Sequence, residues 1–536
     1  MFEELSSASE QLRVALERYL HVCSSIQDIC FQGTMPRHIP REYGTRVDHE
    51  LSLAESYDMK MQQAKVAIKA TRNHAFSISP INYLPPEILT RIFQMARDID
   101  PSSVDHLAVV CSRWRLVTLG SCSLWSHIDY RPDPVKWFYP ELLARARLHI
   151  FRSGGAPLDV CLAVESEIYN NKCRDEPVQS LCKLVGPRMS SLSLELDGLS
   201  WMLTTDRDGG NSVLSTLFST CTPGILTKLV TKDEERFGFL ATKDDHNFET
   251  STLNLDLTAA HLNTIFASIT VLHLTGLFPP WSSHAYRGLV DLRLCAGCIP
   301  DDDEIAEAEL VEILKASPGL RMIHFELGII EWTRRDDQFS VPRVFLPELE
   351  VLQVSSGTGL SFSRVENFLR LLKPGQKPLH LSIRHHSSAA DTKPHTTETR
   401  AFFTRSNITK LHVTRFPQMF ELLSWLPYLK VMVLSDFICW EQQPSDWYPN
   451  HHQSTTRLDT CYLLNCLLPL DDVLALARCY KPRSFVLFGG GFHRDRPDMK
   501  LQTRVVKKEL SSICSDVKIA KTRPNMEEHR DLFYDH

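Results

Sequence analysis

Apolar residues recur at intervals of seven near the amino terminus, in two series three residues apart: Leu5, Leu12, Tyr19 and Ile26, then Ala8, Ala15, Val22 and Ile29. This heptad spacing predicts a helix, which Gly33 and Pro36 end. A second apolar face predicts another helix and contains Leu53, Tyr57, Met61, Ala64 and Ile68. We therefore expect residues 1–78 to form a helical hairpin or a short coiled coil.

Residues 79–130 carry apolar residues at the spacing of short amphipathic helices. Pro86 and Glu87 suit the first turn of a helix, and Asp98 to Pro101 break it. Two further helical stretches follow, first through Val104, Leu107, Ala108 and Cys111 and then through Trp114 and Val117. A three-helix unit of this size buries little surface alone, so its apolar faces predict a binding partner.

From residue 140 to about residue 500, helical stretches alternate with short strands. The strands share the pattern apolar-x-x-apolar-x-apolar, as in Met189, Leu192, Leu194; Ile269, Leu272, Leu274; Leu289, Leu292, Leu294; Leu320, Ile323, Phe325; Leu349, Leu352, Val354; Ile408, Leu411, Val413; and Leu429, Met432, Leu434. Helical stretches are expected at 304–316, 365–372 and 419–426. This repetition predicts an α/β fold, an irregular leucine-rich-repeat solenoid over residues 140–500. Residues 501–536 are charged and weakly periodic, and we expect a cap and a tail there.

Composition and charge narrow the class of protein. Apolar residues make up 43% of the chain and charged residues 23%, as in folded globular proteins. The formal charge of -6 gives no basic field that would attract nucleic acid. Because the sequence shows no signal peptide and no apolar stretch of about 20 residues, we expect no membrane span and a location in the cytoplasm, the nucleus or both.

The search for reactive or metal-binding groups finds little. The 15 cysteines are scattered and expected to be reduced. Cys295 and Cys298 form a Cys-x-x-Cys pair with no second pair at ligand spacing, so no metal site is expected. The pairs His385-His386 and His451-His452 favour solvated loops, the run from Asp301 to Glu304 favours a helix entry, and Gly489 to Gly491 favour a loop in the last repeat. Phosphate-loop, nucleophile-elbow and zinc-protease motifs are absent, so we expect neither catalysis nor a cofactor.

One motif within the three-helix unit resembles a known family. It reads Leu84-Pro85-x-Glu87-Ile88-Leu89-x-x-Ile92-Phe93, then Val110-Cys111-x-x-Trp114, then Leu124-Trp125. This pattern resembles an F-box, and the whole layout is similar to the F-box proteins of mushroom-forming fungi. The resemblance implies that the unit binds a Skp-type adaptor and, through it, a cullin. It also implies an adaptor-binding set of Leu84, Pro85, Ile88, Ile92, Val110, Cys111 and Trp114.

Several of those residues also suit the core of the three-helix unit, Trp114 and Ile92 above all, whereas Leu84 and Pro85 precede the first helix and are the best candidates for contact. The leading expectation is a substrate-recognition subunit of an SCF-type ubiquitin ligase, whose repeats bind an unknown target protein for ubiquitin-dependent degradation. The alternative is an interaction scaffold without ubiquitin transfer. An enzyme on a repeat scaffold would need clustered titratable residues that the sequence does not reveal.

Overall fold

The computed structural model describes residues 2–31, 41–74, 80–131, 139–164, 172–196, 212–233, 238–244, 252–297, 304–330, 343–356, 363–385, 396–414, 425–437, 457–494 and 501–520. The chain divides into two compact units, one of Met1–Ile92 with Ala108–Val117 and one of Phe93–Leu107 with Thr118–His536. Among the described residues, no helix combines the length and the apolar character that a membrane span requires.

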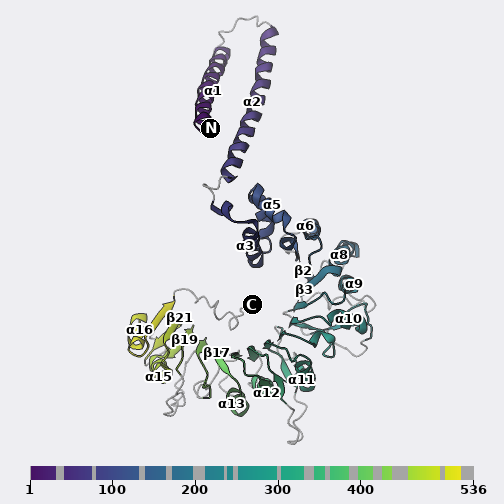
Figure 1. Cartoon of the computed structure of the whole chain (residues 1–536), viewed down its shortest axis with the longest axis vertical. Coiled ribbons are helices and arrows are strands. Elements are labelled where there is room, and N and C mark those ends of the chain that lie inside the picture. The colour runs from purple at the N-terminus through teal and green to yellow at the C-terminus, as the bar shows by residue number, and fades with distance from the viewer. Residues whose placement is uncertain are drawn as a thin grey trace. The chain divides into compact units, whose positions relative to one another are not determined.

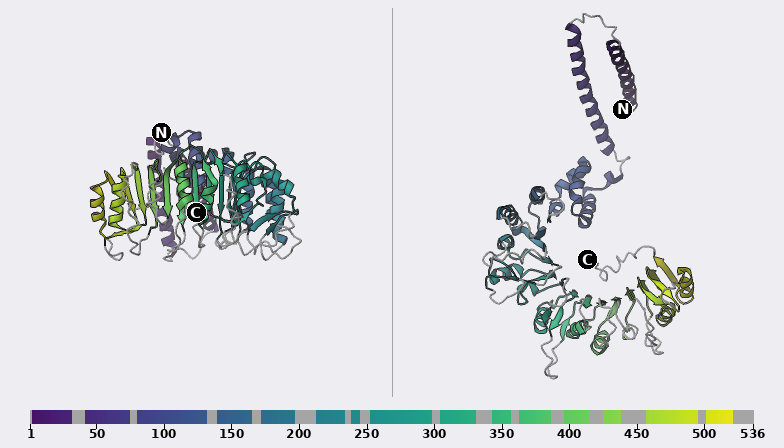
Figure 2. Two further views of the ribbon diagram at one scale, coloured as in Figure 1. Left: turned by 90° about the horizontal axis from the view of Figure 1, so that it is seen from below. Right: turned by 180° about the vertical axis from the view of Figure 1, so that it is seen from behind.

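The first unit begins with two long helices, α1 (Phe2–Phe31) and α2 (Arg41–His74), which run alongside each other (Figures 1 and 2). Tyr19 links them: its hydroxyl donates to Glu50 Oε2 at 3.4 Å, and its ring meets the edge of the Tyr57 ring at 6.5 Å between centroids. The heptad residues Leu5, Leu12, Ile26 and Ile29 nevertheless remain exposed. Self-association of these helices therefore stays a prediction.

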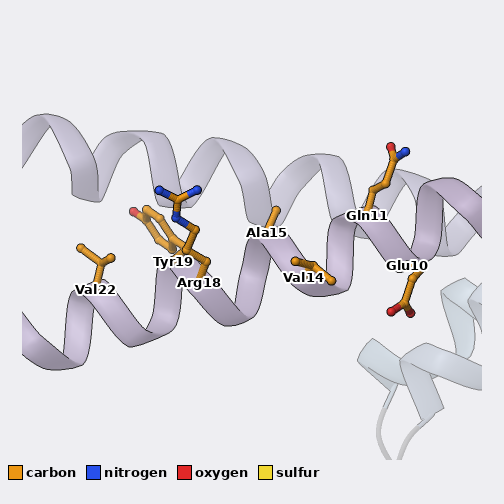
Figure 3. A pocket seen from close by; sticks show the side chains of 7 residues that line it. All are labelled: Glu10, Gln11, Val14, Ala15, Arg18, Tyr19 and Val22. Carbon is orange, nitrogen blue, oxygen red and sulfur yellow. The ribbon is translucent and has the colours of Figure 1, made fainter.

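A groove runs along α1. It has a volume of about 600 Å³ and is lined by Glu10, Gln11, Val14, Ala15, Arg18, Tyr19 and Val22 (Figure 3). These residues recur at intervals of three or four positions, which places them on one helical face. The groove and the exposed heptad residues show how little of the apolar surface of α1 the second helix covers.

Short helices follow at the positions that the apolar spacing predicts. They are the 3-10 turn η1 (Pro80–Tyr83), α3 (Pro86–Ile99), α4 (Ser103–Val110), α5 (Ser112–Gly120) and the 3-10 turn η2 (Cys122–Trp125). Leu89, Phe93, Val104, Ala108 and Leu124 are buried. Most other described residues of these helices are partly or fully exposed.

Fourteen parallel strands form one sheet in the second unit. In sheet order they are β1 (His127–Tyr130), β2 (Leu158–Val164), β3 (Met189–Leu196), β4 (Lys228–Lys232), β7 (Val271–Thr275), β9 (Asp291–Cys295), β11 (Met322–Phe325), β14 (Val351–Ser356), β16 (Leu379–His385), β17 (Ile408–Thr414), β18 (Val431–Ser435), β19 (Thr460–Leu464), β21 (Ser484–Phe488) and β23 (Asp516–Ala520). This order is also the chain order. Each strand therefore pairs with the members of the sheet that precede and follow it in the sequence.

Helices cover one face of this sheet, and the sheet curves with its strands on the inside (Figures 1 and 2). The helices are α6 (Tyr139–Arg152), α8 (Lys172–Val185), α9 (Ser212–Thr220), α10 (Ala259–Phe266), α11 (Glu307–Ala316), α12 (Ser363–Leu371), α13 (Thr396–Arg405), α15 (Leu470–Tyr480) and α16 (Thr503–Ser511). Two 3-10 turns, η3 (Gly186–Arg188) and η4 (His284–Tyr286), also occur among the described residues of this unit.

Alternate residues of each strand pack against the helices. Leu192 and Leu194 of β3, and Leu292 and Leu294 of β9, belong to one continuous apolar cluster that extends from Ile128 to Val517. The residues between them point to the opposite side, because successive side chains of a strand alternate between its two faces. We call that opposite side of the fourteen-stranded sheet the inner face.

Shorter strands form four further parallel sheets. The pairs are β10 (Glu304–Ala306) with β12 (Gly328–Ile330), β13 (Val344–Leu346) with β15 (Leu372–Pro374), and β20 (Leu467–Pro469) with β22 (Gly491–His493), and β5 (Gly238–Ala241) lies between β6 (Thr252–Asn254) and β8 (Leu277–Phe278). Each of these strands is two to four residues long. None of these strands was predicted, because such short segments carry no alternating pattern.

The sheet extends beyond both predicted ends of the repeat region. Strand β1 precedes residue 140, and residues 503–520, expected to be a cap, form α16 and β23, which pairs with β21. Buried Val517 explains this extension, because it continues the apolar cluster within a charged stretch. Gly489 and Gly490, with φ of +62° and +71°, form a turn after β21, in line with the expected loop, whereas Gly491 already begins β22.

Other expectations concern the acidic run before residue 305 and the helical stretches between strands. Glu304 begins β10, so the acidic run leads into a short strand before α11 instead of directly into a helix. The helical stretches at 304–316 and 365–372 correspond to α11 and α12. Residues 298, 301–303, 386, 419–424, 451 and 452 lie outside the described residues, as do the expectations placed on them.

Candidate functional site

The Leu84-Pro85 segment is held in a defined shape ahead of α3. The Leu84 amide donates to the Ile81 carbonyl at 3.2 Å, and the Pro85 carbonyl accepts from the amides of Ile88 and Leu89 at 3.1 Å. Arg113, on α5, donates from Nη2 to the Leu84 carbonyl at 2.5 Å. Arg113 of α5 thus fixes the backbone just before α3. The contact is made to a main-chain oxygen and does not involve the side chain of Leu84 or Pro85.

Cys111 starts α5 by acting as its amino-terminal cap. Its sulfur accepts from the Trp114 amide at 3.4 Å, and its carbonyl accepts from the Arg115 amide at 2.9 Å. A side-chain acceptor at this position satisfies an amide that has no partner in the first turn of a helix. Cys111 therefore has a structural role that the sequence pattern alone did not reveal.

The predicted adaptor-binding residues differ in exposure. Ile88, Ile92 and Val110 are 48%, 41% and 55% exposed, and Pro85 is also exposed. Leu84, Cys111 and Trp114 are partly buried, and none of the seven is fully buried. All seven belong to the first unit of the chain. Ile92 in particular is not confined to the core, which was one of the two expectations for it.

Other exposed apolar residues were not predicted. Near the predicted set, in the same unit, they include Tyr83, Val109 and Leu116. Farther along α3, Met95 and Ile99 are exposed as well. Part of this exposed surface could have been predicted, because residues 88, 92, 95 and 99 lie on one face of a helix. An apolar helix face, however, indicates a buried surface as readily as an exposed one.

Comparison with protein families identifies this segment. A family model described as F-box-like matches residues 81–131. The chain contains an F-box-like domain. The match covers the same stretch as the motif from Leu84 to Trp125, and comparison with curated proteins finds no match to the chain.

Trp125 is the main anchor of the F-box-like domain's carboxyl end in the second unit. It is fully buried, and its indole Nε1 donates to the Thr118 carbonyl at 2.8 Å. The Arg152 guanidinium, on α6, lies 4.3 Å from the centre of its ring, and the His149 ring meets it edge-on at 5.0 Å. This aromatic contact joins the end of the domain to the first helix that covers the sheet.

Asp105 on α4 makes a second connection to that helix. Its carboxylate accepts from Arg145 Nε at 2.7 Å and lies 3.1 Å from His149 Nε2. Burial opposes ionisation of Asp105, but the contacts with His149 and Arg145 outweigh it and lower the pKa of this carboxyl. Because the link combines charge and direction, it favours one orientation of α4 on α6.

The inner face of the sheet offers a second candidate surface. Toward its first strands it carries paired charges, such as Arg131 with Glu195 and His273 with Asp291. Toward its last strands it carries a small apolar cluster, separate from the main core, made of Val431, Val433 and Leu464 with Tyr462 and Phe488 packed against them. This change from polar to apolar character suits recognition of an extended and chemically mixed partner.

Proposed function

We propose that this protein is a substrate-recognition subunit of an SCF-type ubiquitin ligase. In this proposal the F-box-like domain binds a Skp-type adaptor, and through it a cullin. The fourteen-stranded sheet acts as a degenerate leucine-rich-repeat solenoid that binds a target protein. The observation that carries the proposal is the F-box-like match over a segment whose predicted adaptor-binding residues include Ile88, Ile92 and Val110, each more than 40% exposed.

Energetics supports a partner on this surface. Burying an exposed aliphatic side chain contributes about 1.5–3 kcal/mol, so the three side chains together supply enough to anchor a complex. The Leu84 carbonyl is already bound by Arg113, so the segment before α3 loses little freedom when it binds. A preordered loop with exposed apolar side chains is the kind of surface that favours a stable protein partner.

The proposed role requires no catalysis by this chain. A recognition subunit accelerates ubiquitin transfer by holding the target near a reactive group on another subunit, which raises its effective concentration. Asp105 and Trp125 would limit movement between the F-box-like helices of the second unit and the sheet. We further propose a location in the cytoplasm or the nucleus, where such ligases act.

Co-purification of the full chain with a Skp-type adaptor tests the proposal. Replacing Leu84→Ala together with Pro85→Ala should weaken adaptor binding tenfold or more, because two apolar contacts are lost. Ile330→Ala is the matched control, since Ile330 is an exposed aliphatic residue of β12, and it should leave adaptor binding unchanged. Circular dichroism would verify that both variants fold.

The result that overturns the proposal is an unmodified chain that does not bind the adaptor, or a double variant that binds it as well as the unmodified chain does. A reconstituted ligase separates the two interaction roles. Adaptor binding without cullin-dependent ubiquitin transfer would favour an interaction scaffold instead.

A further inference from the structure

Helix α1 carries an apolar seam that the rest of the described chain leaves largely uncovered. We call its two heptad series together the α1 seam: Leu5, Ala8, Leu12, Ala15, Tyr19, Val22, Ile26 and Ile29. The second helix contacts the seam at Tyr19, which meets Glu50 and Tyr57. A groove lies over Ala15, Tyr19 and Val22 (Figure 3). The aliphatic residues of the seam are between 41% and 51% exposed: Leu5, Leu12, Val22, Ile26 and Ile29.

The charged residues of α1 do not interrupt this seam. Arg13 forms ion pairs with Glu10 and Glu17, and these three residues lie on the side of the helix opposite the seam. Arg18 borders the seam, where its long side chain can keep the charged group in solvent. Leu16, which follows Ala15, is 50% exposed and widens the apolar surface. The seam therefore suits an apolar helix with the same seven-residue period.

We propose that the α1 seam binds the α1 helix of a second copy of this chain, in antiparallel orientation. A two-fold interface uses the same patch on both copies, so the patch must be complementary to itself. In an antiparallel pair, the residues of the first heptad series face those of the second. One register uses all eight residues: Leu5 then faces Ile29, Leu12 faces Val22, Tyr19 faces Ala15 and Ile26 faces Ala8.

Side-chain size favours this orientation over a parallel one. In a parallel pair each seam residue faces its own copy, so Ala8 and Ala15 would each meet an alanine and Tyr19 would meet a tyrosine. Two small side chains leave a gap between the helices, and two large ones push the helices apart. In the antiparallel register, Tyr19 and Ile26 each fill the space over an alanine.

The area of the seam is close to what a specific dimer needs. A half-exposed aliphatic side chain presents on the order of 80 Å² of apolar surface, so the five exposed residues of both copies together bury roughly 800 Å². The alanines, Tyr19 and Leu16 add to this area and bring it toward the ~1,200 Å² at which specific interfaces begin. We therefore expect a dimer that dissociates on dilution.

This dimer is independent of the proposed adaptor site. The seam residues precede residues 81–131, so a failure of either proposal leaves the other standing. Two joined chains would present two F-box-like domains and two inner faces to one target. A target with repeated binding sites would then be held with a higher apparent affinity than a single chain provides.

Sedimentation equilibrium of the full chain tests the association. The unmodified chain should have the mass of two chains and dissociate on dilution. Leu12→Glu puts a charge into the seam of both copies and should raise the dissociation constant about tenfold or more. Leu20→Glu is the matched control, because Leu20 is a leucine of α1 that is 57% exposed but lies outside the seam. It should leave the dissociation constant unchanged, and both variants should bind the adaptor normally.

Thiol cross-linking tests the orientation. Ser9 and Cys23 each follow a residue of the second heptad series by one position, and antiparallel pairing brings Ser9 close to the exposed Cys23 of the second copy. In a parallel pair these positions are about 21 Å apart along the helix axis. In a chain with Cys30→Ser, Ser9→Cys should therefore give a two-chain product with a short bismaleimide. Adding Cys23→Ser is the control and should abolish this product.

Each measurement has an outcome that overturns the proposal. A chain that remains monomeric at every concentration would do so, as would a dimer that Leu12→Glu does not weaken. The absence of a cross-linked product, or a product that survives Cys23→Ser, would exclude the antiparallel register. Circular dichroism verifies that the variants retain the helical content of the unmodified chain.

Discussion

A single tryptophan packs the carboxyl end of the F-box-like domain against α6. Trp125 is fully buried and contacts Thr118, His149 and Arg152. Trp125→Ala should lower the free energy of unfolding by about 3–5 kcal/mol, because it leaves a large cavity and removes the indole hydrogen bond to the Thr118 carbonyl. Chemical denaturation of the full chain measures this loss.

The control for this substitution is Phe151→Ala. Phe151 is also an aromatic residue next to the same contact region, on α6, but its side chain is exposed. Its removal should change the free energy of unfolding by no more than about 0.5 kcal/mol. Equal effects of the two substitutions would contradict the role assigned to Trp125.

His127 gives the second unit a dependence on pH. Burial lowers its pKa, but the hydrogen bonds with Asp159 and Cys161 outweigh this effect and raise it to about 9. A raised pKa means that the ion pair stabilises the fold fully below about 6.5, and that this contribution is lost as the pH rises toward 9. The melting temperature should therefore decrease over that range.

Asp159→Asn removes the partner and should remove most of this decrease. The expected difference at pH 7 is about 1 kcal/mol or less, because Asp159 is half exposed and solvent screens the pair. Melting curves at pH 6, 7.5 and 9 for both proteins make the comparison. An identical pH dependence in the variant would exclude the His127–Asp159 pair as its source.

At the scale of elements, several strands with an apolar alternation were predicted, although β16, which alternates as clearly, was missed. The runs ending at Leu194, Leu294 and Phe325 lie in β3, β9 and β11, because their apolar residues face the helix layer. The sequence missed β4 and β19, in which threonine, lysine and tyrosine occupy the inner-face positions. Period-two patterns become weak when a strand has five residues and only two of them reach the core.

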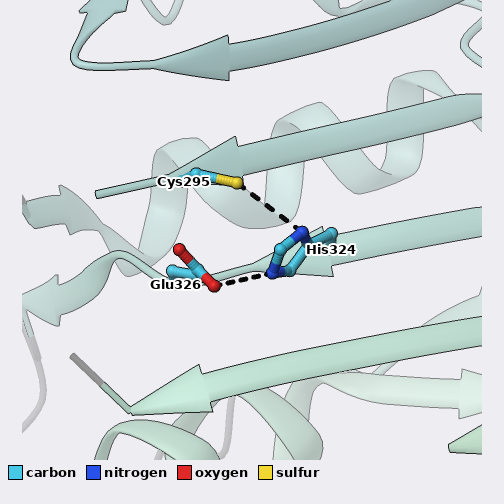
Figure 4. Close-up of side chains that lie close together, drawn as sticks. All are labelled: Cys295, His324 and Glu326. Carbon is cyan, nitrogen blue, oxygen red and sulfur yellow. Dashed lines mark hydrogen bonds and ion pairs between the residues drawn. The ribbon is translucent and has the colours of Figure 1, made fainter. Parts of the chain in front are cut away.

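The candidate sites were predictable to different degrees. The F-box-like motif is continuous in the sequence, and a family model matches it at 81–131. By contrast, Cys295 and His324, whose side chains lie 3.6 Å apart (Figure 4), come from neighbouring strands of the sheet and are 29 positions apart in the chain. Only the register of β9 against β11 brings them together, so a search for closely spaced residues noted Cys298 and missed both His324 and Glu326.

The turn between β21 and β22 depends on glycine. Gly490 has φ of +71°, and a β-carbon there would collide with the backbone of Cys466. Gly490→Ala should destabilise the fold by about 3 kcal/mol or more, since conformational strain and overpacking add. The measurement is chemical denaturation, with Gly224→Ala as the control.

Gly224 also has a positive φ, +85°, but has open space around the position of a β-carbon. Its replacement should cost only the conformational term of about 1–2 kcal/mol. If both substitutions had the same effect, close approach of the Cys466 backbone would not matter to the turn.

At the scale of the whole molecule, α16 and β23 cover the carboxyl-terminal end of the fourteen-stranded sheet. Val506, Leu510, Cys514 and Val517 are buried, and β23 covers the edge of β21. Removing residues 501–536 should expose this edge and its apolar surroundings, and so cause self-association through unpaired backbone groups. Size-exclusion chromatography with light scattering would detect larger species than the untruncated chain forms.

A shorter truncation provides the control for this experiment. Removing only residues 521–536 retains α16 and β23, and it should leave the elution and scattering of the chain unchanged. Aggregation of both truncated proteins would point to the final residues instead of the exposed strand edge.

The order of the fourteen strands has a consequence for how the chain folds and fails. Adjoining strands of the sheet follow one another in the chain, so paired residues such as Leu292 and Ile323 are separated by one strand-to-strand connection and not by most of the chain. Because each of these contacts closes a loop that is short compared with the chain, the sheet can begin to form at any pair of adjoining strands and extend in both directions. A destabilising change at one end of the sheet should therefore unfold the few strands and helices at that end and leave those at the other end folded.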